Sequence, residues 1–204
     1  MPNLYRTTLI FFAFLLSLFS SASGANPFLN APDDKPSVAK FRGAEWGDNI
    51  AQEEIGLSAH VVTTRLAKTS WGEIYRIAFT DIASRAQERR KISTDYFIVT
   101  DDRIVQLNEE DNEAAVKKLA ATEKAPEFDQ NDICAISEGQ FEHTEGPWET
   151  TIELKGDLCI YQANHNSSGH FRKMVWKKGI GLVEYAMGYG ASADGFRLKR
   201  VKNG

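Results

Sequence analysis

The chain has 204 residues, 42% of them hydrophobic, with 24 basic and 28 acidic residues and a net charge of −4. This length and composition fit one domain with a real core. The acidic balance argues against nucleic acid as a partner, since nucleic-acid-binding proteins carry basic patches, and it gives no reason to expect an anionic membrane surface.

Residues 1–25 have the layout of a secretory signal peptide. Arg6 precedes an apolar run over Leu9–Phe19, and small residues follow up to Ala25. The run is shorter than the roughly 20 residues that a membrane-spanning helix needs. We therefore expect export and cleavage after Ala22 or Ala25, which predicts a periplasmic or secreted protein without stable membrane insertion. Loss of Arg6 leaves 23 basic and 28 acidic residues, a net charge of −5.

Residues 26–40 contain three prolines among small and polar residues, which predicts an extended N-terminal tail. A single β-rich domain is expected over residues 41–204. Its first part is hard to assign, because Phe41–Gly47 is short and interrupted by glycine. Ile50–Leu66 is ambiguous, although its β-branched end favours an extended chain.

Hydrophobic periodicity becomes clear after Gly72. Glu73–Thr80 alternates apolar and polar positions as a half-buried strand does, and Tyr96–Thr100 and Arg103–Leu107 flank a turn to form a hairpin. Asn108–Glu123 has the capping residue, early acidic residues and late lysines of a helix.

The C-terminal half is typical of an antiparallel meander, with strands expected over Trp148–Leu154, Leu158–Gln162, Phe171–Trp176, Leu182–Met187 and Phe196–Val201. The fold class that we predict is α+β, mainly antiparallel β. Its form would be a curved sheet or half-barrel meander with one packed helix and one disulfide.

Cys134 and Cys159 are the two cysteines of the chain. In the oxidising compartment that the signal peptide indicates, an even pair predicts a disulfide, which would stabilise the fold by about 3 kcal/mol. The alternative is two buried reduced thiols. A zinc site is disfavoured, because neither cysteine has another ligand at the usual spacing.

Histidines and glutamates offer weaker indications of chemistry. His165 and His170 lie in a stretch with the composition of a hairpin loop, where they could bind zinc with Glu142 or His143, but solvated loop residues are the preferred interpretation. Glutamates surround His143 and could serve acid–base chemistry on sugars; they are Glu138, Glu142, Glu145 and Glu149. No nucleophile or phosphate-loop motif occurs. We assign no catalytic residue, metal ligand or cofactor.

Aromatic residues near the C-terminus favour a binding role. The stretch Met174–Tyr189 combines large rings with glycines that permit tight turns, and rings that leave a core make effective recognition surfaces. The candidate binding residues are Trp148, Trp176, Tyr185 and Tyr189. The alternative is a glycine-bent strand that closes the sheet over its own aromatic residues.

The ten residues Trp176–Tyr185 read WKKGIGLVEY. They resemble the W-x-x-G-x-G-L-V-x-Y strand near the C-terminus of uncharacterised exported bacterial proteins that are rich in β-structure. The resemblance implies a bacterial envelope protein and brings no catalytic residue.

These features favour a non-enzymatic, exported bacterial binding protein, whose partner is a protein or a small apolar ligand. One version is an inhibitor or immunity protein for a toxin or envelope hydrolase, because mild acidity suits a basic partner. Two alternatives are a carrier that holds an apolar ligand in a concavity of the sheet, and a hydrolase that uses His143 and nearby glutamates.

Overall fold

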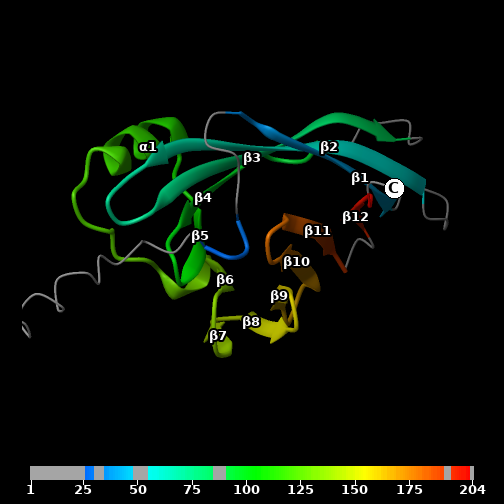
Figure 1. Ribbon diagram of the computed structural model, residues 1–204. Helices are drawn as coiled ribbons and strands as arrows, with labels where there is room; N and C mark the ends of the chain where they lie inside the picture. The colour runs from blue at the N-terminus through cyan, green and yellow to red at the C-terminus, as the bar shows by residue number, and fades with distance from the viewer. Residues whose placement is uncertain (1–25, 30–34, 48–54, 85–90, 191–193, 203–204) are drawn as a thin grey trace, which may run out of the picture.

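The computed structural model describes residues 26–29, 35–47, 55–84, 91–190 and 194–202 (Figure 1). The signal peptide expected over residues 1–25 lies outside these residues. One α-helix, α1 (Asn112–Ala120), and one short 3-10 helix, η1 (Gln130–Asp132), occur in the described chain. No described helix is long and apolar enough to cross a membrane. The strands are β1 (Ser37–Trp46), β2 (Ile55–Lys68), β3 (Glu73–Ser84), β4 (Asp95–Val99), β5 (Arg103–Leu107), β6 (Ile133–Ile136), β7 (Phe141–Glu145), β8 (Trp148–Lys155), β9 (Leu158–His165), β10 (His170–Lys177), β11 (Gly181–Tyr189) and β12 (Asp194–Arg200).

All these strands form one 12-stranded antiparallel sheet in the order β6-β5-β4-β3-β2-β1-β12-β11-β10-β9-β8-β7. Strands that follow one another along the chain pair in the sheet, except that β6 and β7 form its edges and β1 pairs with β12. The sheet curls until it is nearly closed, so that β6 contacts β8 and β9 near the opposite edge. The expected antiparallel β-fold with one helix and a curved sheet is confirmed.

The core lies inside the curl, where rings from the two halves of the sheet meet. Phe97 of β4 packs edge-on against Trp176 of β10, with ring centroids 5.5 Å apart. Tyr185 of β11 lies between Phe79 of β3, at 5.1 Å, and Phe196 of β12, at 5.8 Å. Burial of such large rings is the main source of stability in a fold of this kind.

Helix α1 is shorter than the helix expected over Asn108–Glu123, and its start has a clear cause. The carboxylate of Asp111 accepts a hydrogen bond from the backbone N–H of Ala114 at 3.0 Å, so Asp111 is the N-cap. Asn108 instead donates its side-chain amide to Asp132 at 2.6 Å. That contact ties the residues before the helix to η1.

The segment WKKGIGLVEY is a hairpin rather than one strand. Trp176 and Lys177 end β10, and β11 begins at Gly181. Gly179 and Gly181 have φ angles of 70° and 92°, in the region that favours glycine, and they form the turn. The glycines therefore serve the turn and do not make Trp176 or Tyr185 project, since these side chains are 0% and 2% exposed.

The residues expected to form an N-terminal tail include a buried segment, Asn26–Leu29. Phe28 and Leu29 are 0% and 3% exposed and belong to the core. The carbonyl of Pro27 accepts a hydrogen bond from the N–H of Gly179 at 2.8 Å. Strand β1 then begins at Ser37, inside the range of the expected tail.

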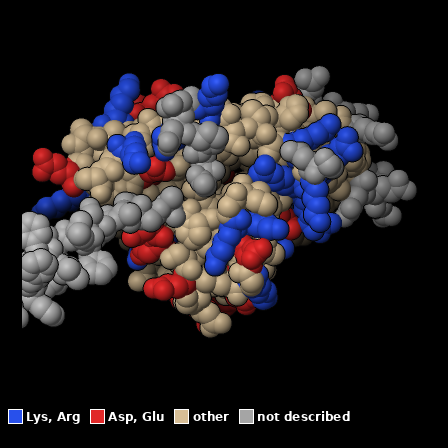
Figure 2. Space-filling model, viewed as in Figure 1, with Lys and Arg blue, Asp and Glu red and all other residues tan. Residues whose placement is uncertain are grey.

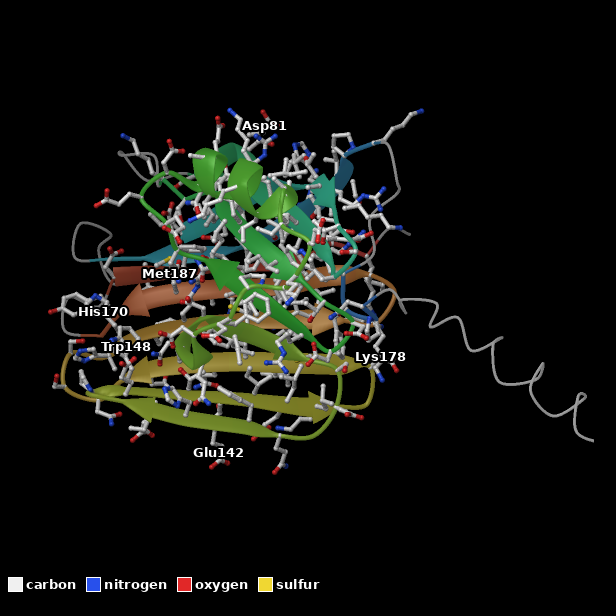
Figure 3. All side chains as sticks on the ribbon, turned by 90° about the vertical axis from the view of Figure 1, so that its left-hand side faces the viewer. Asp81, Glu142, Trp148, His170, Lys178 and Met187 are labelled. Atoms are coloured by element: carbon white, nitrogen blue, oxygen red, sulfur yellow. The ribbon has the colours of Figure 1, made fainter. Side chains whose placement is uncertain are left out.

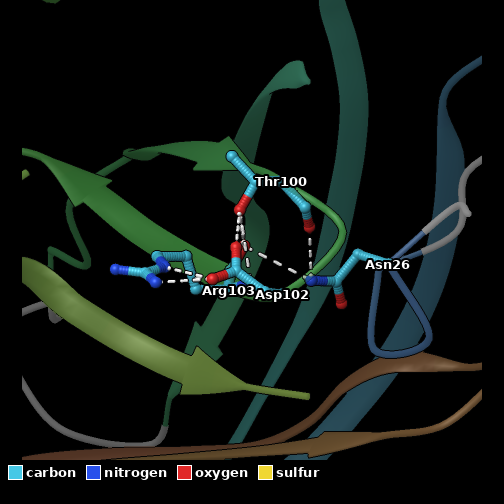
Figure 4. Close-up of polar contacts among 4 residues, drawn as sticks. All are labelled: Asn26, Thr100, Asp102 and Arg103. Atoms are coloured by element: carbon cyan, nitrogen blue, oxygen red, sulfur yellow. Dashed lines mark hydrogen bonds and ion pairs between the residues drawn. The ribbon is translucent and has the colours of Figure 1, made fainter. Parts of the chain in front are cut away.

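Asn26 joins this segment to the turn between β4 and β5 (Figure 4). Its side-chain amide donates to the carbonyls of Thr100, at 2.7 Å, and Arg103, at 3.3 Å. Asp102 orders the turn by accepting hydrogen bonds from Thr100 and Arg103. Although partial burial raises the pKa of Asp102, the bonds from Arg103 and Thr100 hold it below the usual value.

The disulfide expected between Cys134 and Cys159 is absent, so that prediction is wrong. Both cysteines are buried and unbonded, Cys134 on β6 and Cys159 on β9. The thiol of Cys134 donates to the carbonyl of Asp132 at 3.3 Å. The cysteines pack as small apolar side chains inside the curl, and an even count in the sequence carries no information about their geometry.

Burial raises the pKa of Cys134 to about 12 and that of Cys159 to about 11. Since the thiolate is the reactive form, the folded protein should resist alkylation at pH 8. We expect a maleimide reagent to label no cysteine in the native protein, and two per chain after unfolding without a reductant. A chain that yields no label when unfolded, yet two after reduction, would contradict this account.

Candidate binding site at one end of the sheet

Four rings form a row across neighbouring strands at one end of the sheet. Trp148 begins β8 and pairs with His165 at the end of β9. His170 begins β10 and pairs with Tyr189 at the end of β11. Figure 3 shows Trp148 and His170 together at this end of the strands, with Met187 nearby and Lys178 at the opposite end. We call Trp148, His165, His170 and Tyr189 the ring row.

The ring row lies on the core-facing side of the sheet. Side chains two residues apart on a strand share a face, and paired residues on neighbouring strands do too. Two layers further along the same strands lie four core residues, paired in register: Ile152, Tyr161, Met174 and Tyr185. The ring row therefore continues the core to the end of the sheet, where it meets solvent.

The rings contact one another in sequence along the row. Trp148 and His165 are T-shaped with centroids 4.9 Å apart, and those of His165 and His170 lie 6.1 Å apart. His170 stacks on Tyr189 at 4.0 Å. Trp148 is 39% exposed, and Met187, from the same face of β11, is 40% exposed. The site thus presents a preformed apolar and aromatic surface.

The loop between β9 and β10 positions the two histidines. The backbone N–H of Ser168 donates to Nδ1 of His165 at 3.2 Å, which orients the His165 ring. The hydroxyl of Ser168 lies 2.9 Å from Nδ1 of His170. Gly169, at a φ of 71°, allows the tight turn. Its carbonyl accepts the N–H of Gly190 at 2.9 Å, which joins the loop to the end of β11.

A polar network lies one layer inside the ring row. Arg172 of β10 donates to Asp95 of β4 at 3.0 Å and to the hydroxyl of Tyr185 at 3.1 Å. Tyr185 donates to Asp95 at 3.2 Å, and the amide of Gln106 donates to Asp95 at 3.3 Å while its oxygen accepts from Arg172. These contacts bridge β4 and β5 to β10 and β11 across the interior.

Burial sets the electrostatics of this network. It raises the pKa of Asp95, against the opposing effects of Arg172 and the hydrogen bond from Tyr185. Burial lowers the pKa of Arg172, but the combined effect of its neighbours, chiefly Tyr185 and Asp95, in the opposite direction is larger. The net effect raises the pKa of Arg172, which therefore stays charged. Its Nε atom has no hydrogen-bond partner among the described residues. The pair is therefore a desolvated charge pair held by neighbouring polar groups.

The structure divides the four candidate binding residues into two pairs. Trp148 and Tyr189 lie in the ring row. Tyr185 anchors the polar network with its hydroxyl, and the indole N–H of Trp176 donates to the buried carbonyl of Cys134 at 3.1 Å. Tyr185 and Trp176 are core residues rather than part of the surface of the site, and Trp176 lies toward the other end of β10.

The residues considered for catalysis do not converge. His143 pairs with the buried Thr150 and shares its face, whereas Glu142 and Glu149 occupy positions of the opposite parity on β7 and β8. Glu138 precedes β7, and Glu145 contacts Asn131. Among the described residues, no three His, Cys, Asp or Glu side chains are grouped to hold a metal ion.

A separate pocket of about 370 Å³ lies between α1 and the face of β4 and β5 that points away from the inside of the curl. Its apolar lining includes Ile98, Val105, Leu107, Leu119 and Phe128, and its polar lining includes Glu109, Lys118, Glu127, Asp129 and Asp132. Burial, together with Asp129 and Glu109, raises the pKa of Asp132. The pocket thus combines an apolar floor with an excess of carboxylates.

Two network residues could have been found from the sequence. Asp95 shares strand parity with Phe97, and Arg172 shares it with Met174 and Trp176. A charged residue at an apolar position of a strand indicates a buried pair. No such sequence pattern indicated the ring row, because its four residues lie next to three separate turns along the chain.

No protein-family model and no curated protein matches this chain. The resemblance of the WKKGIGLVEY segment to exported bacterial proteins therefore stays a prediction.

Breaking the Arg172–Asp95 pair should leave a buried charge without its partner. We expect Asp95→Asn or Arg172→Met alone to lower the free energy of unfolding by about 3 kcal/mol, and the double variant by less than the sum. Glu153→Ala is the control, because its pair with Lys155 is exposed and should contribute less than about 1 kcal/mol. Denaturant unfolding of the four variants measures this, and additive effects in the double variant would contradict the coupling.

Proposed function

We propose that the chain is an exported, non-enzymatic binding protein that recognises a protein partner through the ring row. The observation that carries this proposal is the continuous row of Trp148, His165, His170 and Tyr189, which ends in solvent beside Met187. Half-exposed rings held by strand pairing lose little conformational entropy on binding, which is why aromatic residues dominate recognition surfaces.

The surroundings of the ring row favour a basic partner. Glu145 pairs with Trp148 across β7 and β8, and Glu149 follows Trp148 directly. Glu149 lies on the opposite face of β8 at the same end of the sheet, where it accepts a hydrogen bond from Asn166 of the β9–β10 loop at 2.8 Å. Carboxylates at the edge of an apolar patch steer and orient a cationic protein. This arrangement suits an inhibitor or immunity protein whose target is a basic toxin or envelope hydrolase.

Site-specific cross-linking tests the proposal in the producing cell. A photo-reactive phenylalanine analogue at position 148 should capture one protein partner. The same analogue at position 180 should capture no partner, because Ile180 lies in the turn at the other end of β10 and β11. Ile180 is a matched control, since it is as exposed as Trp148, at 41%. With the purified partner, Trp148→Ala should weaken the affinity by about 30-fold, as expected for a central aromatic residue, and Ile180→Ala should leave it unchanged.

Equal capture from positions 148 and 180, or an unchanged affinity of Trp148→Ala, would contradict the proposal. The pocket beneath α1 supports a second candidate, a carrier of a small apolar ligand that bears a cationic group. A small amine that co-purifies with the exported protein, together with an absence of cross-links at position 148, would favour the carrier.

A further inference from the structure

Although the chain has a net negative charge, the outside of the sheet carries a basic face. Five cationic side chains lie on β1, β12 and β10: Lys40, Arg42, Lys173, Arg197 and Lys199. Their strand neighbours Phe41, Leu198 and Met174 are buried in the core, so the cations point to the opposite side. Figure 2 shows Lys and Arg side chains gathered over the end of the molecule where Figure 1 places β1 and β12. We call these five residues the outer basic face.

Strand register places like charges together within this face. Arg42 pairs directly with Lys199, and the next outward-facing residue of β12 toward its start is Arg197. Cations opposite one another in an antiparallel sheet are destabilising. Glu184 of β11 lies 3.1 Å from Lys173 and 3.5 Å from Lys199, so a single carboxylate serves two lysines.

Three of the cations lack an ion-pair partner among the described residues. Lys40, Arg42 and Arg197 are exposed and make no ion pair within the described part of the chain. The repulsion between these cations is not neutralised within the described residues. The face is therefore complementary in charge to a partner that carries negative groups. The whole-chain charge gave no sign of this face, because it sums cations and carboxylates over the entire chain.

We propose that the outer basic face docks the protein on an anionic lipid surface. The cations spread over β1, β12, β11 and β10, which together span roughly 15 Å, and this two-dimensional array matches a layer of headgroups. Val38, which shares this face with Lys40, is 61% exposed and adds an apolar contact. The outward aromatic residues of these strands among the described residues, Trp46 and Phe171, are only partly exposed, which disfavours single-stranded nucleic acid, since its bases stack on exposed rings.

Docking through this face leaves the ring row free, because the two surfaces lie on opposite sides of the sheet. Lys173 and Arg172 are neighbours on β10, yet Lys173 belongs to the outer basic face and Arg172 to the network beneath the ring row. The protein could therefore be held at a membrane while its other face binds a partner.

Vesicle co-sedimentation of the exported protein tests the proposal. The protein should bind phosphatidylcholine vesicles that contain one-third phosphatidylglycerol, and not vesicles of phosphatidylcholine alone. Each cation near an anionic surface contributes about fivefold in affinity, so the variant Lys40→Gln/Arg42→Gln/Arg197→Gln should bind at least tenfold more weakly. High salt should abolish binding of the unmodified protein.

A matched control removes three exposed cations from other parts of the chain, in the variant Lys91→Gln/Lys117→Gln/Lys124→Gln. The affinity of this control for the vesicles should stay within twofold of the parent. Both variants keep the same N-terminus, so any contribution of Leu9–Phe19 to vesicle binding is equal in the two. Thermal unfolding of the face variant should match or exceed that of the parent, because like-charge repulsion is relieved. Equal losses in both variants, equal binding to neutral vesicles, or binding to polyglutamate without vesicle binding would overturn the proposal.

Discussion

The fold depends on one closure, in which Asn26–Leu29 fastens two hairpin turns that belong to opposite halves of the sheet. Asn26 holds the β4–β5 turn through the carbonyls of Thr100 and Arg103, and Pro27 holds the β10–β11 turn through Gly179. A curled sheet exposes its interior at both ends unless something covers it. Phe28 and Leu29 cover one end with apolar side chains that are almost fully buried.

This closure explains why the two ends of the sheet differ. At the covered end, the hairpin turns are fixed to the N-terminal segment. At the other end, the core terminates in the ring row, and the Arg172–Asp95 pair bridges the walls of the curl one layer further in. Because the charge pair supplies the contact between the walls there, no apolar segment is needed to cover that end. The rings therefore stay in contact with solvent.

Sequence patterns predicted the antiparallel fold, the single helix and the later hairpins, because these depend on local periodicity. They missed β1, where Gly43 interrupts the pattern. That glycine is required, since a Cβ atom at this position would lie 1.7 Å from the carbonyl oxygen of Arg197 in the paired strand β12. Local sequence patterns also cannot show which distant residues meet in space, which explains the wrong disulfide and the incomplete prediction of the site. Trp148 and Tyr189 were recognised individually, but their neighbours His165 and His170 become apparent only from the register of four strands.

Hydrogen exchange at the amide of Gly179 tests the closure most directly, because this N–H donates to the carbonyl of Pro27. We predict strong protection of this amide in the unmodified protein, and its loss in Phe28→Ala, which removes the buried ring that anchors the segment. The amide of Lys173, within β10, should stay protected in both proteins. A Gly179 amide that exchanges freely in the unmodified protein, or that keeps its protection in Phe28→Ala, would contradict the account.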